Sequence, residues 1–261
     1  MRIAHLSDMH LLEPTERHGF GARFVSLGRR LDAEGRLDKA RAAIAHARAS
    51  GAEHYLFTGD LTETGTPAQF EALAALLAEC NLRDDEVTLI PGNHDAYTSE
   101  NAWRDALEGP LRPWKKDDVV DLGDTFILPI DATFHQPVTR SAARLTEDIE
   151  RALEARLADP ALSRTNVIVA IHHPPHPRPG PWHWVDGLLG CKRLLAMIEH
   201  RENLTVMHGH LHRAQTKEHG VARVIGAAAI VDGALPDVHG ERRRAAEGGR
   251  CEFGRRAALV A

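Results

Sequence analysis

Short apolar runs alternate along the chain with longer segments in which apolar residues recur at helical spacing. The short runs predict β-strands, and the longer segments predict amphipathic helices. We expect strands at residues 1 to 7, 54 to 58, 87 to 91, 126 to 130 and 167 to 171, and another ending near Val206. Helices are expected at residues 37 to 48, near 99 to 108, and after Thr66 and Thr146. This alternation is typical of a layered α/β fold.

The two threonines are candidate helix N-caps. Thr66 precedes Pro67 at the first helical position, and Gln69 stands three residues after the threonine, which is a capping-box arrangement. Thr146 precedes two acidic residues, which suit the positive end of a helix dipole. Both helices are therefore predicted to have a defined start.

The length fits one large domain or two small ones, and we expect a single domain over residues 1–261. Residues 11–35 are less regular. Apolar residues at helical spacing within them indicate a short cap helix packed on its own domain, with a substrate gate or a membrane-surface helix as alternatives. The arginine-rich segment 240–261 is expected to be a poorly defined tail.

Composition narrows the class of protein. The chain is 43% hydrophobic and 26% charged, as in soluble globular proteins, and its net charge of -5 disfavours long nucleic acid as a partner. Cys80, Cys191 and Cys251 are odd in number and lack CxxC spacing, which fits a reducing compartment. No secretory signal is visible, and no apolar run is long enough for a membrane span, so we expect a cytoplasmic location. A homo-oligomer is compatible with the sequence.

Residue types that bind metals follow directly on the predicted strands. They are Asp8 and His10, Asp60, Asn93 with His94 and Asp95, His172, and His210 with His212. Sites in open α/β folds form at the carboxyl ends of strands, so these side chains are expected to converge. Asp8 and His10 are two residues apart, as are His210 and His212, and such pairs leave the same face of an extended backbone.

The converging set mixes nitrogen and oxygen ligands, which suits manganese, iron, zinc or cobalt better than calcium or magnesium. It also holds too many ligands for one tetrahedral ion, so two metals that share Asp60 are the simpler explanation. His94 adds a proton that moves near neutral pH, and Asp95 a carboxylate able to orient an imidazole. Each motif alone is explained as well by turn chemistry, and only their joint occurrence indicates a site.

With these motifs the chain resembles the calcineurin-like metallophosphoesterase superfamily. The signature of Asp-x-His, Gly-Asp, Gly-Asn-His-Asp, His and Gly-His-x-His is complete, and the resemblance runs from residue 3 to about 212. Ile171-His172-His173-Pro174-Pro175, and Asp186-Gly187-Leu188 ahead of a helix, look most similar to the bacterial cyclic-nucleotide and glycerophosphodiester phosphodiesterase branch. The resemblance implies an α/β fold, a two-sheet β-sandwich flanked by helices in four αββα layers.

The resemblance also implies roles for the candidate residues. One metal ion would be held by Asp8, His10, Asp60 and His212, and the other by Asp60, Asn93, His172 and His210. His94 would be a catalytic imidazole rather than a ligand, with Asp95 orienting its ring. Attack by a metal-bridging hydroxide on a small phosphorylated substrate would follow.

Substrate choice is expected to depend on loops outside the metal ligands. In the proline-rich loop 174 to 187, His176, Trp182 and Trp184 are candidates for binding a nucleobase, or the tryptophans simply pack the loop down. Residues 133 to 144, with His135 and Arg140, are a further candidate wall of the substrate site. A phosphodiesterase is expected. A phosphomonoesterase or nucleotide-lipid pyrophosphohydrolase would use the same metals, whereas a non-catalytic scaffold would lack ligands or His94, and none is missing.

Overall fold

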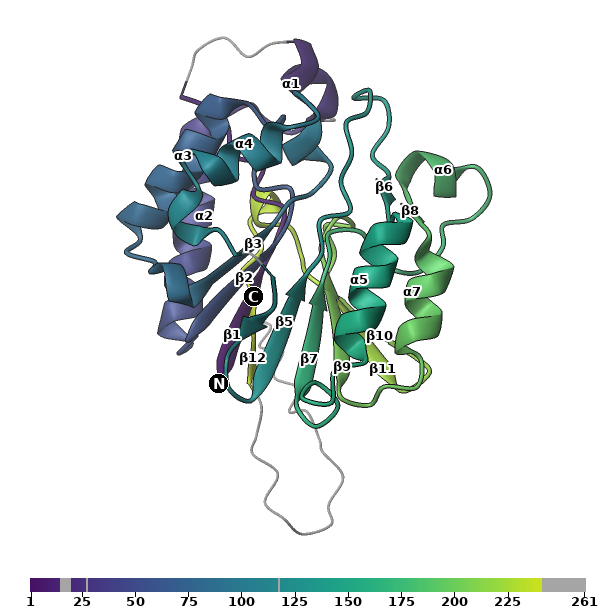
Figure 1. The fold of residues 1–261 in the computed structure, drawn as a ribbon. Helices are drawn as coiled ribbons and strands as arrows, with labels where there is room; N and C mark the ends of the chain where they lie inside the picture. Colours follow the sequence, from purple (N-terminus) through teal and green to yellow (C-terminus); the bar gives the residue numbers. More distant parts are fainter. Residues whose placement is uncertain (15–19, 27, 117, 241–261) are drawn as a thin grey trace, which may run out of the picture.

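The computed structural model describes residues 1–14, 20–26, 28–116 and 118–240. Two β-sheets face each other, and helices cover the outer face of each sheet (Figure 1). The first sheet has the strand order β12-β1-β2-β3, and the second has the order β10-β11-β9-β7-β5-β4. The predicted α/β fold, with two sheets between flanking helices, is confirmed.

The first sheet is mostly parallel. Its strands are β1 (Arg2–Leu6), β2 (His54–Thr58) and β3 (Val87–Ile90), which pair in parallel, and β12 (Asp237–Gly240), which pairs antiparallel with β1. Alternate side chains face opposite sides, so Leu56 meets the second sheet while Tyr55 and Phe57 pack against helices. Both faces of the sheet are covered, which explains why its strands read as nearly continuous apolar runs.

The second sheet has four parallel strands with an antiparallel strand at each edge. The parallel strands are β5 (Thr125–Pro129), β7 (Asn166–Ala170), β9 (Leu204–His208) and β11 (Ala222–Gly226). The edge strands are β4 (Val120–Asp121) and β10 (Gln215–His219), and a separate small pair is formed by β6 (Ala143–Arg144) and β8 (Leu188–Leu189). The edge strands were not predicted, because β4 is very short and β10 is largely polar and exposed.

Helices complete the outer layers (Figure 1). The first sheet is covered by α2 (Ala33–Ala49), α3 (Pro67–Glu79) and α4 (Ala102–Glu108), and the second by α5 (Glu147–Leu157) and α7 (Cys191–Ile198). The short helices α1 (Phe20–Val25) and α6 (Trp182–Asp186) lie beyond the strand ends at the top of the view. Single turns of 3-10 helix are η1 (Asp84–Glu86), η2 (His94–Ala96), η3 (Arg112–Trp114) and η4 (Ile230–Asp232).

Helix starts follow the capping chemistry with two differences. The Thr66 and Thr146 hydroxyls accept from the backbone N–H groups of residues 69 and 149, as expected of N-caps. The Gln69 side chain accepts instead from the Thr64 N–H at 2.8 Å, so the capping box is only half formed. The second helix begins at Ala33 rather than Leu37, because the Asp32 carboxylate accepts from the Gly35 N–H and caps it.

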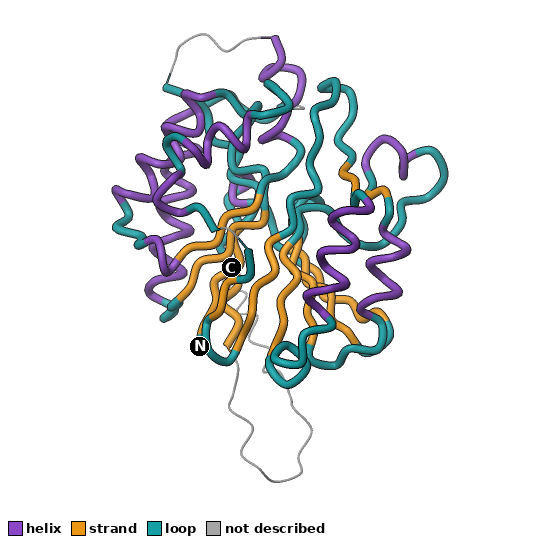
Figure 2. Tube along the Cα trace, viewed as in Figure 1, coloured by secondary structure: helices purple, strands orange, loops and turns teal. Residues whose placement is uncertain are grey.

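The inner faces of the two sheets form a thin apolar layer. Its buried members are Ile3, Leu56, Ile90, Ile127, Ile168, Ala170, Met207 and Ile225. The parallel strands of both sheets run in the same sense, as their arrows show in Figure 1, so their carboxyl ends and the following loops gather at the upper end of the sandwich (Figure 2). This end receives the residues that follow β1, β2, β3, β7 and β9.

The chain beyond Arg213, which the family signature does not reach, completes both sheets through β10, β11 and β12. Of the expected tail, residues 241–261 lie outside the described residues, as do 15–19 and 27 of the expected cap segment. Among the residues that the structure describes, no helix has the length and apolar character that crossing a membrane requires.

Candidate metal centre

The candidate ligands leave their strands in an unusual backbone conformation. Asp8, His10, Asp60, His210 and His212 all have positive φ angles, of 54°, 49°, 49°, 67° and 52° respectively. Left-handed backbone is uncommon outside glycine and costs free energy, so it persists only where neighbouring structure holds it. The expectation that each pair shares one face of an extended backbone is therefore wrong, although both pairs reach the same site.

Two neighbouring loops hold this backbone in place. The Asp8 N–H donates to the Gly59 carbonyl at 3.0 Å, and the His10 N–H donates to the Asp60 carbonyl at 2.9 Å. The loops after β1 and β2 thus continue to pair beyond the strands, and Leu11 forms a parallel bridge with Thr62. Gly59 itself has a φ of 92° and no room for a side chain, because a Cβ there would lie 2.6 Å from His172 Nδ1.

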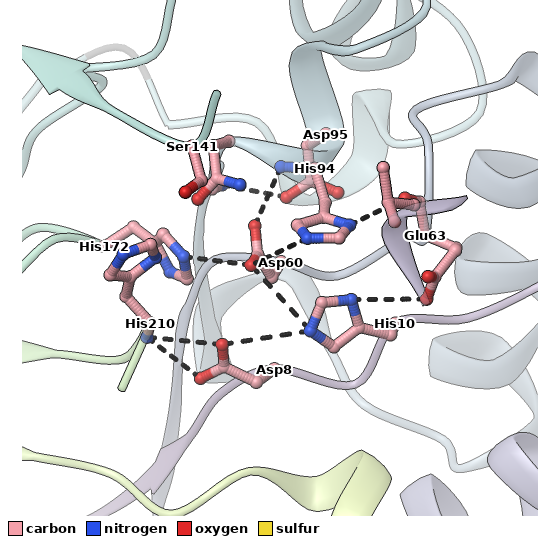
Figure 3. A network of polar contacts seen from close by, with 12 residues as sticks. Asp8, His10, Asp60, Glu63, His94, Asp95, Ser141, His172 and His210 are labelled. Atoms are coloured by element: carbon pink, nitrogen blue, oxygen red, sulfur yellow. Dashed lines mark hydrogen bonds and ion pairs between the residues drawn. The ribbon is translucent and has the colours of Figure 1, made fainter. Parts of the chain in front are cut away.

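Asp60 lies at the centre of the side chains that converge (Figure 3). Its Oδ2 is 3.1 Å from His172 Nε2, 3.8 Å from His10 Nε2 and 3.9 Å from His94 Nε2. Its Oδ1 accepts from the His94 backbone N–H at 2.9 Å. A buried carboxylate approached by three imidazole nitrogens is the arrangement expected of a group that bridges cations.

Asp8 forms a second centre beside the first. Its Oδ1 is 3.4 Å from His212 Nε2 and 4.0 Å from His10 Nε2, and the Nε2 atoms of the two histidines are 3.3 Å apart. The His210 backbone N–H approaches both oxygens of Asp8 at 3.2 Å. Asp8, His10 and His212 form one set of side chains that could hold a metal ion, and Asp8, Asp60 and His172 form another.

One buried atom tests whether metals fit these sets. Asn93 Oδ1 is buried and has no hydrogen-bond partner, and His172 Nε2 lies 3.1 Å from the Asp60 carboxylate. Burying an unpaired carboxamide oxygen costs about 1 to 3 kcal/mol, so a polypeptide rarely leaves one so without a ligand. A carboxamide oxygen and an imidazole nitrogen beside two buried carboxylates match the donors that transition metals take, and the residues present therefore fit such ions.

In four of the histidines, one ring nitrogen contacts a carbonyl or carboxylate oxygen that fixes the orientation of the ring. His172 Nδ1 contacts the Thr58 carbonyl at 2.6 Å, and His94 Nδ1 contacts the Glu63 carbonyl at 2.8 Å. A carbonyl only accepts, so both Nδ1 atoms donate, and both Nε2 atoms face Asp60. His210 Nε2 contacts Asp186 Oδ1 at 2.6 Å and His212 Nδ1 contacts Asp232 Oδ2 at 2.9 Å.

Glu63, a residue without a role in the sequence motifs, supports His10. Its Oε2 is 3.4 Å from His10 Nδ1 and also contacts the Arg36 guanidinium, and both partners of this ion pair are buried. Ser26 Oγ donates to Glu63 Oε1 at 2.6 Å. The segment after α1 is thus tied to the candidate centre through one carboxylate.

Tyr97 supports Asn93 in a similar way. Its hydroxyl accepts from Asn93 Nδ2 at 3.0 Å and donates to the Arg140 carbonyl at 3.1 Å. With Nδ2 engaged, the Asn93 amide has a fixed orientation that leaves Oδ1 unpartnered. Sequence motifs gave no role to Tyr97, Glu63, Asp186 and Asp232, because their separations in sequence from the ligands they support follow no regular spacing.

The expected role of Asp95 is wrong. Its Oδ1 accepts from Thr62 N and Oγ1 at 2.8 and 2.7 Å, and its Oδ2 from Gly92 N and Leu61 N at 2.8 and 3.1 Å. These bonds fasten the loop after β2 to the turn after β3. The ring of His94 is oriented by Glu63, and Asp95 acts instead on the backbone that carries Asp60.

Electrostatic interactions within the site shift the pKa values of its ionisable side chains. Burial opposes ionisation of Asp60, but the nearby His172 and His94 rings hold the pKa of its carboxyl well below the usual range. Burial likewise opposes the charged form of His172, but the Asp60 carboxylate raises the pKa of this imidazole to about 9. Burial and the neighbouring His94 lower the pKa of His10 to about 4. The protonation of the site thus depends on electrostatic interactions between the Asp60 carboxylate and the imidazoles around it.

The candidate substrate loop is fastened to the same site through Asp186 at the end of α6. Trp182 and Trp184 are 62% and 61% exposed, so the alternative that they pack the loop down is wrong. The Arg140 guanidinium carbon lies 4.2 Å from the centre of the Trp184 ring. His176 lies beside His219 of β10, with ring centres 5.9 Å apart.

Comparison with known sequences places the chain among phosphoesterases. A sequence model of the family described as "Calcineurin-like phosphoesterase" matches residues 1–214. A protein of Rhodococcus erythropolis named "Probable cyclic nucleotide phosphodiesterase" is 29% identical over 222 residues, or 82% of this chain and 65% of that protein. A protein of the same name from Vesicomyosocius okutanii is 25% identical over 162 residues, which cover 61% of this chain and 62% of that protein. The chain therefore spans less than two thirds of the length of either relative.

The fold has solved counterparts. A dimetal phosphatase from Danio rerio superposes with a TM-score of 0.63 at 13% identity, covering 88% of each chain. At this identity the likeness concerns the fold alone. The matched residues 1–214 contain every candidate ligand of the metal centre, and the chain belongs to the calcineurin-like phosphoesterase family.

Proposed function

We propose that the chain is a dinuclear-metal-dependent phosphohydrolase that cleaves small phosphodiesters of the cyclic-nucleotide or glycerophosphodiester type. The observation that carries the proposal is the buried, unpartnered Asn93 Oδ1, together with the His172 Nε2 atom that lies 3.1 Å from the carboxylate of Asp60. The names of the two sequence relatives support a diester rather than a monoester.

In this proposal Asp60 would be shared between two ions. Asp8, His10 and His212 would complete the ligands of one ion, and Asn93, His172 and His210 would complete those of the other. The mixture of imidazole, carboxylate and carboxamide favours manganese, iron, zinc or cobalt. Such ions, when bound, supply Lewis-acid chemistry that activates water and neutralises charge on phosphoryl oxygens.

His94 holds the proton that the leaving group needs. Its Nδ1–H donates to the Glu63 carbonyl, so Nε2 is the atom that faces the site and exchanges protons with a substrate. From there it donates a hydrogen bond or a proton to the leaving oxygen. Asp95 contributes by holding the loops that place Asp60.

His176, Trp182 and Trp184 are proposed to contact the organic part of the substrate. The exposed indole rings offer flat faces on which a nucleobase can stack. The described cysteines, Cys80 and Cys191, are free thiols, which supports the cytoplasmic location expected from the sequence.

The test compares hydrolysis of bis(p-nitrophenyl) phosphate with that of p-nitrophenyl phosphate by the manganese-loaded protein. We expect a preference for the diester that Asn93→Ala abolishes together with binding of Mn²⁺. His94→Ala should keep Mn²⁺ and lose about 10²- to 10⁴-fold in turnover. The matched control is His200→Ala, which removes an exposed imidazole just after the end of α7 and should change neither quantity.

A preference for the monoester would replace the proposal with a phosphomonoesterase that uses the same metals. Turnover of neither ester by protein that binds Mn²⁺ would contradict the proposal and leave a pyrophosphate-specific enzyme or a binding scaffold. Normal turnover by His94→Ala would remove His94 from the mechanism.

A further inference from the structure

A ladder of alternating cations and aromatic rings joins the loop between β5 and β6 to Arg144 of β6 and Trp184 of α6. The Arg140 guanidinium carbon lies 4.2 Å from the centre of the Trp184 ring and 5.1 Å from that of Phe134. The Arg144 guanidinium carbon lies 4.8 Å from the centre of the same Phe134 ring. The ladder thus consists of Arg144, Phe134, Arg140 and Trp184, in that order of contacts, and it contains two positive charges.

Neither guanidinium of the ladder is neutralised. Among the residues that the structure describes, no carboxylate lies within ion-pair distance of Arg140 or Arg144. The nearby carboxylate of Asp186 is already shared between Arg178 and His210. Burial and the neighbouring Arg144 lower the pKa of Arg140, which shows that the two like charges oppose each other.

The position of Arg140 joins the ladder to the candidate metal centre. Its carbonyl accepts from the Tyr97 hydroxyl, which in turn accepts from Asn93 Nδ2. The next residue, Ser141, has its carbonyl 2.5 Å from His173 Nε2, and the His173 ring stacks on His210 with ring centres 3.9 Å apart. Figure 3 shows Ser141 at the edge of the group formed by Asp60, Asp95 and His172. The backbone at Arg140 and Ser141 is thus linked to residues of the candidate metal centre.

The orientation of the guanidinium limits what it can bind. Its Nε donates to the Trp184 carbonyl at 2.9 Å and its carbon lies near the rings of Phe134 and Trp184, while the buried Nη2 has no partner. A guanidinium held in this way offers only its N–H edge, and that edge matches the oxygens of phosphate or carboxylate in the same plane. Two unneutralised cations suit a doubly charged phosphate monoester better than a singly charged carboxylate.

We propose that Arg140, assisted by the charge of Arg144, binds a second phosphoryl group of the substrate, carried by the organic part that flanks the scissile phosphodiester. This inference rests on the proposed function and refines its substrate class. The preferred diester would carry a terminal phosphate in addition to the phosphorus that is cleaved. Binding of that phosphate would orient the substrate against the metal centre from the side of α6.

The test measures binding of two nucleotides that differ by one phosphate. Calorimetry of the manganese-loaded protein compares thymidine 3′,5′-bisphosphate with thymidine 5′-monophosphate. Charge-assisted hydrogen bonds of this kind predict an affinity about tenfold or more higher for the bisphosphate. Arg140→Gln, which keeps a stacking side chain but removes the charge, should reduce the ratio to about one, and Arg140→Lys should retain part of it because lysine is a point charge.

Arg151→Ala is the matched control, because it removes an exposed guanidinium of α5 paired with Asp148 and should leave the ratio unchanged. A wild-type ratio near one, or a ratio that Arg140→Gln does not alter, would overturn the inference. Turnover of the 5′-p-nitrophenyl esters of the same two nucleotides is measured in parallel. If neither ester is cleaved while the binding ratio depends on Arg140, the proposed function fails and the phosphate site stands.

Discussion

The hydroxyl of Tyr97 is predicted to control both stability and metal affinity. Tyr97→Phe keeps the aromatic ring, which packs edge-on to His94 with ring centres 5.0 Å apart, and removes two hydrogen bonds of 3.0 and 3.1 Å. Asn93 Nδ2 and the Arg140 carbonyl would then lose their partners in a buried environment. At about 1 to 2 kcal/mol for each group, the free energy of unfolding should fall by roughly 2 to 4 kcal/mol.

The effect on metal binding has a separate cause. Without the hydroxyl, the Asn93 amide is free to rotate, and Oδ1 loses the orientation that directs it to the candidate centre. Loss of an outer partner of this kind typically weakens metal affinity by about 10- to 100-fold. Calorimetric titration with Mn²⁺ measures the affinity, and urea unfolding of the metal-free protein measures the stability.

The control for this variant is Tyr55→Phe. Tyr55 is also buried, but it lies on β2 and faces the helices rather than the candidate centre. The Tyr55→Phe variant should keep the wild-type affinity for Mn²⁺. If Tyr97→Phe bound Mn²⁺ as tightly as the wild type and unfolded at the same urea concentration, the reasoning about Asn93 would be refuted.

Two further predictions concern the backbone and the layer between the sheets. A Cβ at Gly92 would lie 2.2 Å from Asp60 Oδ1 and 2.3 Å from the Asp60 backbone nitrogen. Gly92→Ala should therefore displace Asp60 and abolish the binding of Mn²⁺, which calorimetry measures. Wild-type affinity in this variant would contradict the prediction. His54 has its pKa lowered to about 4 by burial and by Lys116, whereas the unfolded chain titrates near 6.5. The unfolded chain therefore binds the proton first as pH falls, and stability should decline from about pH 6.5 towards pH 4, by on the order of 3 kcal/mol from this residue. Urea unfolding at pH 7 and pH 5 should show a smaller decline for His54→Gln, and an unchanged decline would contradict the assignment.

The elements that organise the centre could be predicted because their signals are local. The strands that end at Leu6, Thr58 and Ile90 are buried on both faces, so each reads as a continuous apolar run. Thr66 and Thr146 mark helix starts through bonds to residues three positions away. The short and polar strands β4 and β10 carry no such signal, since pairing with a neighbouring strand is what defines them.

The residues that support the ligands could not be predicted in the same way. Asp186 contacts His210, which is 24 positions away in the sequence. Tyr97 contacts both Asn93 and the carbonyl of Arg140, which is 43 positions after Tyr97. Asp95 stands next to His94 in sequence, but its carboxylate is directed to the backbone of residues 61, 62 and 92. Adjacency in sequence suggested a partnership that the turn of η2 prevents, because successive side chains of a helical turn diverge.

The sequence by itself determined the kind of chemistry available, since the imidazoles, carboxylates and the carboxamide at strand ends limit the ligands that can be bound. It also determined the layered fold, because the apolar periods leave few ways to bury those strands and helices. Only the tertiary structure decided which atoms face the centre. The left-handed backbone at Asp8, His10 and Asp60, the bond from Tyr97 that leaves Asn93 Oδ1 unpaired, and the unneutralised stack around Arg140 all depend on contacts between loops that are distant in sequence.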